Sequence, residues 1–277
     1  MIIFAIPFRA KQTTKNWKTS CRNLENTLDS IFNQTDSEFH CILACNEKPE
    51  LTKKYDNRLE IISLDIPVPT KWIEMARDKN WKLLVIAKRV KEILKNELDT
   101  QKGVYVMPVD GDDLLNCNIA SYVKRHPNEN GFVSKSGYVD WGQGKPYLMI
   151  YKRMYTFCGS CNIIKMFIDD LPDELPDSKY CHDKEMARKL NARYPIRWDH
   201  NIVVDKYAEM GKPFTYLPFK STIYIKNTGE NISNLYHAEN QKQDNKRYHP
   251  VAFIKSLYPF QYKKISSKLR KEFFYYR

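Results

Sequence analysis

The sequence predicts an α/β protein with a mostly parallel central sheet that is flanked by helices on both faces. Strand-like and helix-like segments alternate along the first 115 residues with short connections. The first of these segments is an almost continuous apolar run, which is typical of a strand buried on both faces. With 277 residues and 42% hydrophobic content, the chain is long enough to cover such a sheet.

The elements of the first half follow in order. Residues 1–9 are expected to form the first strand. A helix follows, with Thr13 or Thr14 as its N-cap, because apolar side chains recur at helical spacing at Trp17, Cys21, Leu24, Leu28, Ile31 and Phe32. Two helices are expected between Lys71 and Leu98, ended by Gly103. The remaining strands are expected at Glu38–Cys45, Arg58–Ile66 and Val104–Val109.

The second half of the sequence is more irregular. A strand pair around a Gly-rich turn is expected within residues 131–153, and an apolar strand or helix after Asn162. A helix capped by Asp177 or Ser178 should reach Leu190, and strand character returns over Phe214–Tyr224.

Charge and cysteine content restrict the class of protein. A net charge of +12 attracts anions, which include nucleic acid, anionic lipid and phosphorylated small molecules. Seven cysteines, an odd number without a framework spacing, favour a reducing compartment. No apolar stretch approaches about 18 residues, and the N-terminal run lacks signal-peptide features. We therefore expect a cytoplasmic, unexported protein.

Three carboxylates are crowded into the turn after the fourth predicted strand: Asp110, Asp112 and Asp113. Their repulsion predicts a divalent cation, and an oxygen-only ligand set favours Mg²⁺ or Mn²⁺ bound together with substrate phosphates. An exposed Asp-Gly turn without a ligand is the alternative. The turn's position favours the metal, because ligands of parallel sheets bind beyond the carboxyl ends of the strands.

Basic side chains precede this turn in the predicted helical region, at Lys79, Lys82, Lys88 and Arg89. A diphosphate near the metal would account for some of them, and the others form a solvated face. From this set we expect Lys82 and Arg89 to bind the donor.

Asp183 lies on the apolar stripe of the helix that contains Met186, Ala187 and Leu190, all within about 60° of it on a helical wheel. One interpretation is a carboxylate that bonds the first-turn N–H groups. The other is a general base that takes a proton from an acceptor hydroxyl. The helix alone does not decide between them.

Taken together, these segments resemble the GT-A glycosyltransferases, particularly the inverting family-two type, over residues 1 to 235. The segments that carry the resemblance are IPFR, VMPVDGDDLL, FCGSCNIIK, CHDKEMARKL and IYIKNTGENIS. The resemblance implies a Rossmann-like GT-A fold over residues 1–240, with a nucleotide-sugar half (1–115) and an acceptor half (116–240). A basic helical segment would follow at residues 247–277.

The resemblance also implies roles for individual residues. Pro7, Phe8 and Arg9 would border the nucleotide base, and Gly159 and Ser160 the donor sugar. Asp110 and Asp112 would form the metal and diphosphate site, with Asp113 as a further ligand, and Asp183 would be the base. Asn46 stands where relatives carry an acidic pair that helps bind the base, His182 replaces a Glu, and His237 is a substitute ligand. A UDP-sugar is the expected donor, and a glycan or lipid-linked glycan of a surface polysaccharide the expected acceptor.

Other interpretations explain less of the sequence. A sugar-phosphate nucleotidyltransferase shares the sheet but should carry a Gly-rich basic loop after the first strand. A nucleic-acid binder explains the charge but not the aspartates, which repel phosphates. A redox or zinc site at Cys158-Gly-Ser-Cys161 would need a second ligand pair, for which adjacent Cys181 and His182 are poor candidates.

The C-terminal segment has two interpretations of its own. After Pro259, apolar side chains fall on one helical face, at Tyr262, Ile265, Leu269, Phe273 and Tyr276. This face either packs on the domain or lies on an anionic membrane surface.

Overall fold

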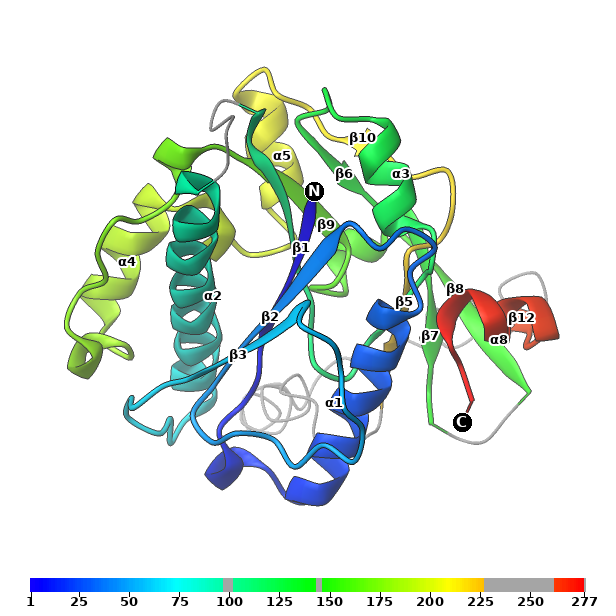
Figure 1. Cartoon of the computed structure of the whole chain (residues 1–277), viewed down its shortest axis with the longest axis horizontal. Coiled ribbons are helices and arrows are strands. Elements are labelled where there is room, and N and C mark those ends of the chain that lie inside the picture. Colours follow the sequence, from blue (N-terminus) through cyan, green and yellow to red (C-terminus); the bar gives the residue numbers. More distant parts are fainter. Residues whose placement is uncertain (97–101, 143–145, 227–261, 277) are drawn as a thin grey trace, which may run out of the picture.

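The computed structural model describes residues 1–96, 102–142, 146–226 and 262–276, and its central sheet is flanked by helices (Figure 1). Neighbouring strands are parallel except at β9, which is antiparallel to β4 and β6. The predicted α/β class with a mostly parallel sheet is therefore confirmed. From edge to edge the seven strands are β10 (Thr215–Tyr216), β6 (Gly131–Val133), β9 (Asn162–Met166), β4 (Val104–Pro108), β1 (Ile2–Pro7), β2 (Phe39–Cys45) and β3 (Leu59–Ser63).

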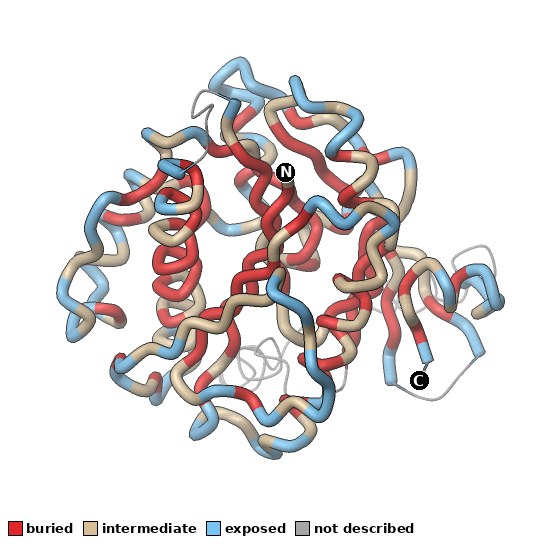
Figure 2. Tube along the Cα trace, viewed as in Figure 1, coloured by how far each residue is buried: buried red, intermediate tan, exposed pale blue. Residues whose placement is uncertain are grey.

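Both faces of β1 are buried, which explains its continuous apolar sequence (Figure 2). Ile2, Phe4 and Ile6 belong to the core beneath α1 (Trp17–Phe32) and α3 (Ile119–Arg125). Ile3 and Ala5 belong to the opposite core, beneath α2 (Trp72–Lys95) and α5 (Val203–Glu209). This alternation follows from the two-residue period of a strand.

Two predictions about the flanking helices are wrong. The N-cap of α1 is Asn16, whose side chain accepts a 3.0 Å hydrogen bond from the Thr19 N–H, whereas Thr13 lies in a short 3-10 turn, η1 (Lys11–Thr13). In the described part of this region, residues 71–96, there is one long helix, α2, because its sequence contains no Gly or Pro to interrupt it.

A helix was also expected from Asp177 or Ser178 onward, but a 3-10 turn, η5 (Ser178–Tyr180), comes first. The α-helix α4 (Lys184–Arg193) begins only after Asp183. Asp183 is therefore the N-cap of α4 and does not lie within its first turn. The other short 3-10 turns are η3 (Met154–Thr156), η4 (Ile168–Asp170) and η6 (Pro195–Arg197).

A second, five-stranded sheet packs beside the aspartate turn. Its order is β12 (Tyr262–Lys264), β8 (Tyr147–Lys152), β7 (Ser136–Asp140), β11 (Thr222–Ile225) and β5 (Leu114–Leu115). The antiparallel pairing of β7 with β8 confirms the predicted strand pair. The turn at residues 143–145 lies outside the described residues, as do residues 227–261, which contain His237 and the start of the predicted tail segment.

The end of the chain packs on this second sheet. Leu269 and Phe273 of α8 (Ser267–Phe273) are buried in a cluster with Leu114 and Ile223. These apolar side chains are thus covered by the protein, as the packed interpretation expected, while Tyr262 lies in β12 and not on the helix. In the described residues, no helix is both long and apolar enough to span a membrane.

The strand order creates a crevice at one edge of the main sheet. The chain runs from β1 outward to β2 and β3, then returns to β4 on the other side of β1. The loops that leave the carboxyl ends of β1 and β4 therefore diverge, and ligands of such sheets bind at this switch point.

Candidate functional site

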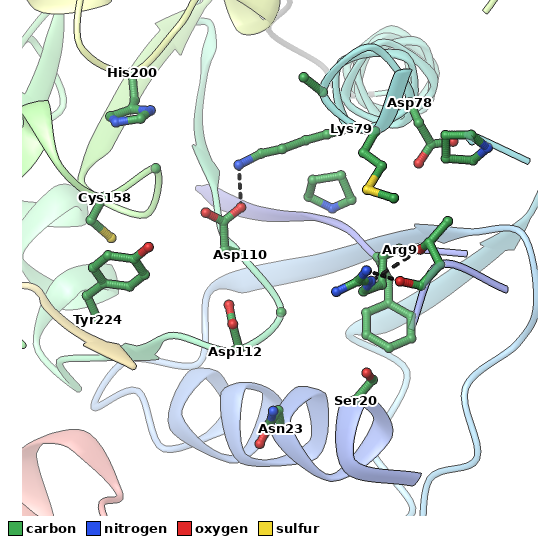
Figure 3. A pocket seen from close by; sticks show the side chains of 18 of the residues that line it. Arg9, Ser20, Asn23, Asp78, Lys79, Asp110, Asp112, Cys158, His200 and Tyr224 are labelled. Carbon is green, nitrogen blue, oxygen red and sulfur yellow. Dashed lines mark hydrogen bonds and ion pairs between the residues drawn. The ribbon is translucent and has the colours of Figure 1, made fainter. Parts of the chain in front are cut away.

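A cavity of 290 Å³ lies at the carboxyl ends of β1 and β4. Its lining comes from the loop after β1, the starts of α1 and α2, the aspartate turn and residues 157–159, together with His200 and Tyr224. Figure 3 shows Arg9 and Ser20 on one side, the aspartates in the middle, and His200, Cys158 and Tyr224 on the other side.

One end of the cavity is formed by the predicted Pro7-Phe8-Arg9 segment, and all three residues line it. Phe8 is 4% exposed, and its ring centroid lies 5.5 Å from that of Trp17. The guanidinium of Arg9 donates to the hydroxyl of Thr13 at 3.2 Å and also to its carbonyl.

Ser20 adds a polar group at this end that sequence reasoning missed. It is 3% exposed and lines the cavity, and no hydrogen-bond partner for its hydroxyl is found among the described residues. Since buried polar groups are normally satisfied, a ligand atom is a natural partner for this hydroxyl.

The aspartate turn forms the middle of the cavity. It is closed by a 3.1 Å hydrogen bond from the Asp113 N–H to the Asp110 carbonyl, and Asp110 and Asp112 line the cavity. The ammonium of Lys79, from the first half of α2, donates to the Asp110 carboxylate (Figure 3). Burial by itself disfavours the charge of Lys79, but the Asp110 carboxylate outweighs this effect and raises the pKa of Lys79.

Asp113 has a different environment from its neighbours, because its side chain is fully buried and does not line the cavity. Its carboxyl accepts hydrogen bonds from the Ser160 hydroxyl at 2.6 Å and the Cys158 thiol at 3.2 Å. Burial, followed by the nearby acidic groups of Cys158, Asp112 and Asp110, raises the pKa of Asp113 well above its usual range. Ser160 in turn accepts from the Asp110 N–H at 2.8 Å.

These environments bear on the predicted metal site. The Asp113 carboxyl is buried beneath the turn, where it is hydrogen-bonded by Ser160. The Asp110 carboxylate is paired with the ammonium of Lys79. No group of three or more His, Cys, Asp or Glu side chains in the described part of the chain is placed to hold a metal ion. The described residues therefore do not fit the three-aspartate Mg²⁺ or Mn²⁺ centre that the sequence predicts.

Residues 158–161 pack beside the aspartate turn, and two of them, Cys158 and Gly159, also line the cavity. Gly159 lines the cavity, where a Cβ atom would lie 2.9 Å from Asp110 Oδ2 and 3.2 Å from Lys79 Nζ. Ser160, a predicted donor contact, is fully buried beneath the turn. Cys158 and Cys161 are free and buried, and burial raises the pKa of Cys158, so its thiol is poorly suited to redox chemistry.

Besides Ser160, three further predicted donor contacts do not line the cavity. Asn46 donates to the Ile66 carbonyl at 3.1 Å. Lys82 is fully buried, and its ammonium lies 2.7 Å from the Asp78 carboxylate. Arg89 pairs with Glu60, and it lies about 15 Å further along α2 than Lys79 at 1.5 Å per residue.

Asp183, the predicted base, is exposed and does not line the cavity. Its carboxylate accepts a 2.7 Å hydrogen bond from the Met186 N–H, which is the capping role that the sequence left open. The preceding residue, His182, lies nearer the site: its Nε2 atom is 3.8 Å from the carboxylate of Asp78, a cavity residue. Burial opposes the charge of His182, but Asp78 raises its pKa to about 9.

His200 was missed by the sequence analysis, although its imidazole lines the cavity opposite Arg9 (Figure 3). Its Nδ1 atom lies 3.1 Å from the Asp199 carboxylate, and this hydrogen bond lowers the pKa of Asp199. The Asn162 amide donates to the His200 carbonyl at 2.9 Å and anchors the loop. In the sequence, only the adjacent Asp199 and His200 could have indicated this contact, and no recognisable motif surrounds them.

Comparisons with known proteins give no family. No family model and no curated protein matches the chain. A crystal structure of 2-C-methyl-D-erythritol 4-phosphate cytidylyltransferase from Francisella tularensis is similar over 87% of this chain and 99% of that chain, with 10% identity and a TM-score of 0.30. A similarity this distant supports no inference about function.

Removing the Ser160 hydroxyl should destabilise the protein, because this hydroxyl donates a hydrogen bond to the Asp113 carboxyl and accepts one from the Asp110 N–H. We expect Ser160→Ala to lower the free energy of unfolding by about 1–3 kcal/mol, measured by urea denaturation. The control is Ser267→Ala at an exposed helix position, which should change it by less than about 0.5 kcal/mol. Equal effects of the two substitutions would contradict the buried role of Ser160.

His182 should make stability depend on pH. Its pKa of about 9 in the folded protein exceeds the ordinary 6.5, so its contribution is complete below pH 6.5 and is lost as pH rises through 9. The loss is less than the value of about 3 kcal/mol that this difference in pKa represents, because solvent screens the charge of a partly buried group. Urea denaturation of wild type and His182→Gln at several pH values measures it. If the variant loses as much stability as the wild type over this interval, another group is responsible.

Proposed function

We propose that this chain transfers a sugar from a nucleotide-sugar donor to a hydroxyl of a glycan acceptor, as the inverting GT-A glycosyltransferases that its motifs resemble do. The observation that carries the proposal is the continuous cavity that joins Phe8 and Arg9 to Asp110 and Asp112, and these to His200. It lies at the switch point of a parallel sheet, where nucleotides commonly bind.

The two ends of the cavity would bind different parts of the donor. The end with Phe8, Arg9 and Ser20 offers an aromatic ring, a cation and a buried hydroxyl, which suit a nucleoside. The middle, with Asp110, Lys79 and Asp112, would hold the ribose hydroxyls and the diphosphate. The sugar would then lie toward Gly159 and His200.

The charges that line the cavity favour this proposal over a sugar-phosphate nucleotidyltransferase. Such an enzyme must bind a nucleoside triphosphate, which brings more negative charge than a nucleotide sugar. The cavity lining contains two cationic side chains, Arg9 and Lys79, and Lys79 is already paired with Asp110, so little positive charge is left for a triphosphate. This balance suits a ligand with hydroxyl groups and a single diphosphate.

Two residues are candidates for the base that deprotonates the acceptor. Asp183 stays a prediction, with a carboxylate that caps α4 at an exposed position. His200 is favoured by its place in the cavity and by Asp199, which bonds Nδ1 and leaves Nε2 to accept a proton. We therefore assign the base to His200, with Asp199 as the group that orients it.

A nucleoside diphosphate should stabilise the protein. We expect one member of a panel of UDP, GDP, CDP and ADP to raise the melting temperature by about 5 °C at about 100 times its Kd, measured by differential scanning fluorimetry. Gly159→Ala should reduce this shift, because its Cβ would lie 2.9 Å from Asp110 Oδ2. Ser267→Ala, at an exposed position, is the control.

The matching nucleotide sugar should then be hydrolysed slowly, since water can replace the acceptor. Release of pyrophosphate from a nucleoside triphosphate and a sugar phosphate, without hydrolysis of any nucleotide sugar, would instead identify a nucleotidyltransferase. No shift with any nucleotide would contradict both functions.

Substitutions at the two candidate bases should separate their roles. Asp183→Asn removes the carboxylate but keeps a good N-cap, so we expect near-normal donor hydrolysis. His200→Gln should lower the rate by about 10²–10⁴-fold with little change in donor affinity, because general base catalysis contributes about this much. The reverse pattern, with the loss at Asp183, would restore the assignment made from the sequence.

A further inference from the structure

Lys79 lines the cavity and places a positive charge beside the carboxylates of the aspartate turn. It comes from the first half of α2, the part of the helix that lies beside the carboxyl ends of the strands. Its ammonium donates to the Asp110 carboxylate, and both side chains keep 30% of their surface exposed. A ligand in the cavity can therefore reach this ion pair.

The chemistry of an ammonium group suits a second, simultaneous ligand. It carries three N–H donors, so it can bond the Asp110 carboxylate and phosphate oxygens together. Lysine binds phosphates in this way, as a compact point charge. A divalent ion between a carboxylate and a diphosphate has the same electrostatic role.

The surroundings keep Lys79 in place and charged. A Cβ atom on Gly159 would lie only 3.2 Å from Lys79 Nζ, so the missing side chain leaves room at the ammonium. The ion pair with Asp110 holds the ammonium beside the turn. Asp113, the remaining predicted metal ligand of the turn besides Asp112, is committed to Ser160 and Cys158.

We propose that Lys79 is the cation that binds the diphosphate of the donor, so that nucleotide binding does not require a divalent metal ion. This inference rests on the proposed function, because it names the diphosphate group of that donor. It replaces the three-aspartate metal centre with an ion pair between α2 and the turn after β4. Lys82 and Arg89, selected from the sequence, do not line the cavity, and each is paired with a carboxylate, Asp78 and Glu60 respectively.

The experiment measures nucleotide affinity with and without metal. The full chain is titrated with whichever of UDP, GDP, CDP and ADP gives the largest thermal shift, by calorimetry, in EDTA and in Mn²⁺. We expect wild type to bind equally well in both. Lys79→Met should weaken binding in EDTA about tenfold or more, and Mn²⁺ should restore part of it by occupying the vacated place beside Asp110.

Two further variants control the result. Lys88→Met removes an exposed lysine of the same helix that pairs with Glu92, and it should leave the affinity unchanged. Lys79→Arg keeps a positive charge, and it should retain binding in EDTA even where Lys79→Met is too unstable to titrate.

The outcomes separate this inference from the proposed function. If wild type binds the nucleotide only with Mn²⁺, or if Lys79→Met binds as tightly as wild type in EDTA, the role of Lys79 is overturned and the transferase proposal stands. If none of the four nucleotides binds with or without Mn²⁺, the proposed function itself fails.

Discussion

Mutual repulsion among the three carboxylates of the turn after β4 is the constraint on which the site depends. Each carboxylate has a different environment. Asp110 is paired with the ammonium of Lys79, whereas Asp113 is buried beneath the turn, with a raised pKa and a hydrogen bond from Ser160. Asp112 remains in the cavity lining. The three aspartates thus differ: one is in an ion pair, one is buried beneath the turn, and one lines the cavity.

Helix α2 connects this turn to the rest of the cavity. Lys79 reaches the aspartate turn, while the preceding residue, Asp78, pairs with the buried Lys82 and lies near His182 before α4. The guanidinium of Arg197 donates to the Asn80 carbonyl at 2.9 Å and so joins η6 to the same helical segment. A continuous helix therefore holds the aspartate turn, the residues before α4 and η6 in a fixed relation, which favours preorganised binding.

The fold could be predicted because the apolar patterns that indicate its strands are local in the sequence. Much of the site could not be predicted, because it depends on contacts between distant segments. Apolar runs located the parallel strands, and the switch-point rule placed Phe8 and Asp110 at one edge. Which lysine of α2 reaches that edge depends on the position of the helix start, and three residues already move a side chain by about 4.5 Å. A turn sends adjacent side chains in different directions, so the sequence could not show that Asp113 is buried. His200 enters the cavity through a loop anchored by Asn162, a contact without a local pattern.

The distribution of charge also restricts what the cavity binds. The chain has a net charge of +12, yet its cavity lining contains more carboxylates than cationic side chains. The basic excess therefore lies elsewhere in the chain. Carboxylates in a binding site accept hydrogen bonds from hydroxyl groups. A ligand that brings several hydroxyls together with a diphosphate satisfies both the aspartates and Lys79, and a nucleotide sugar has this composition.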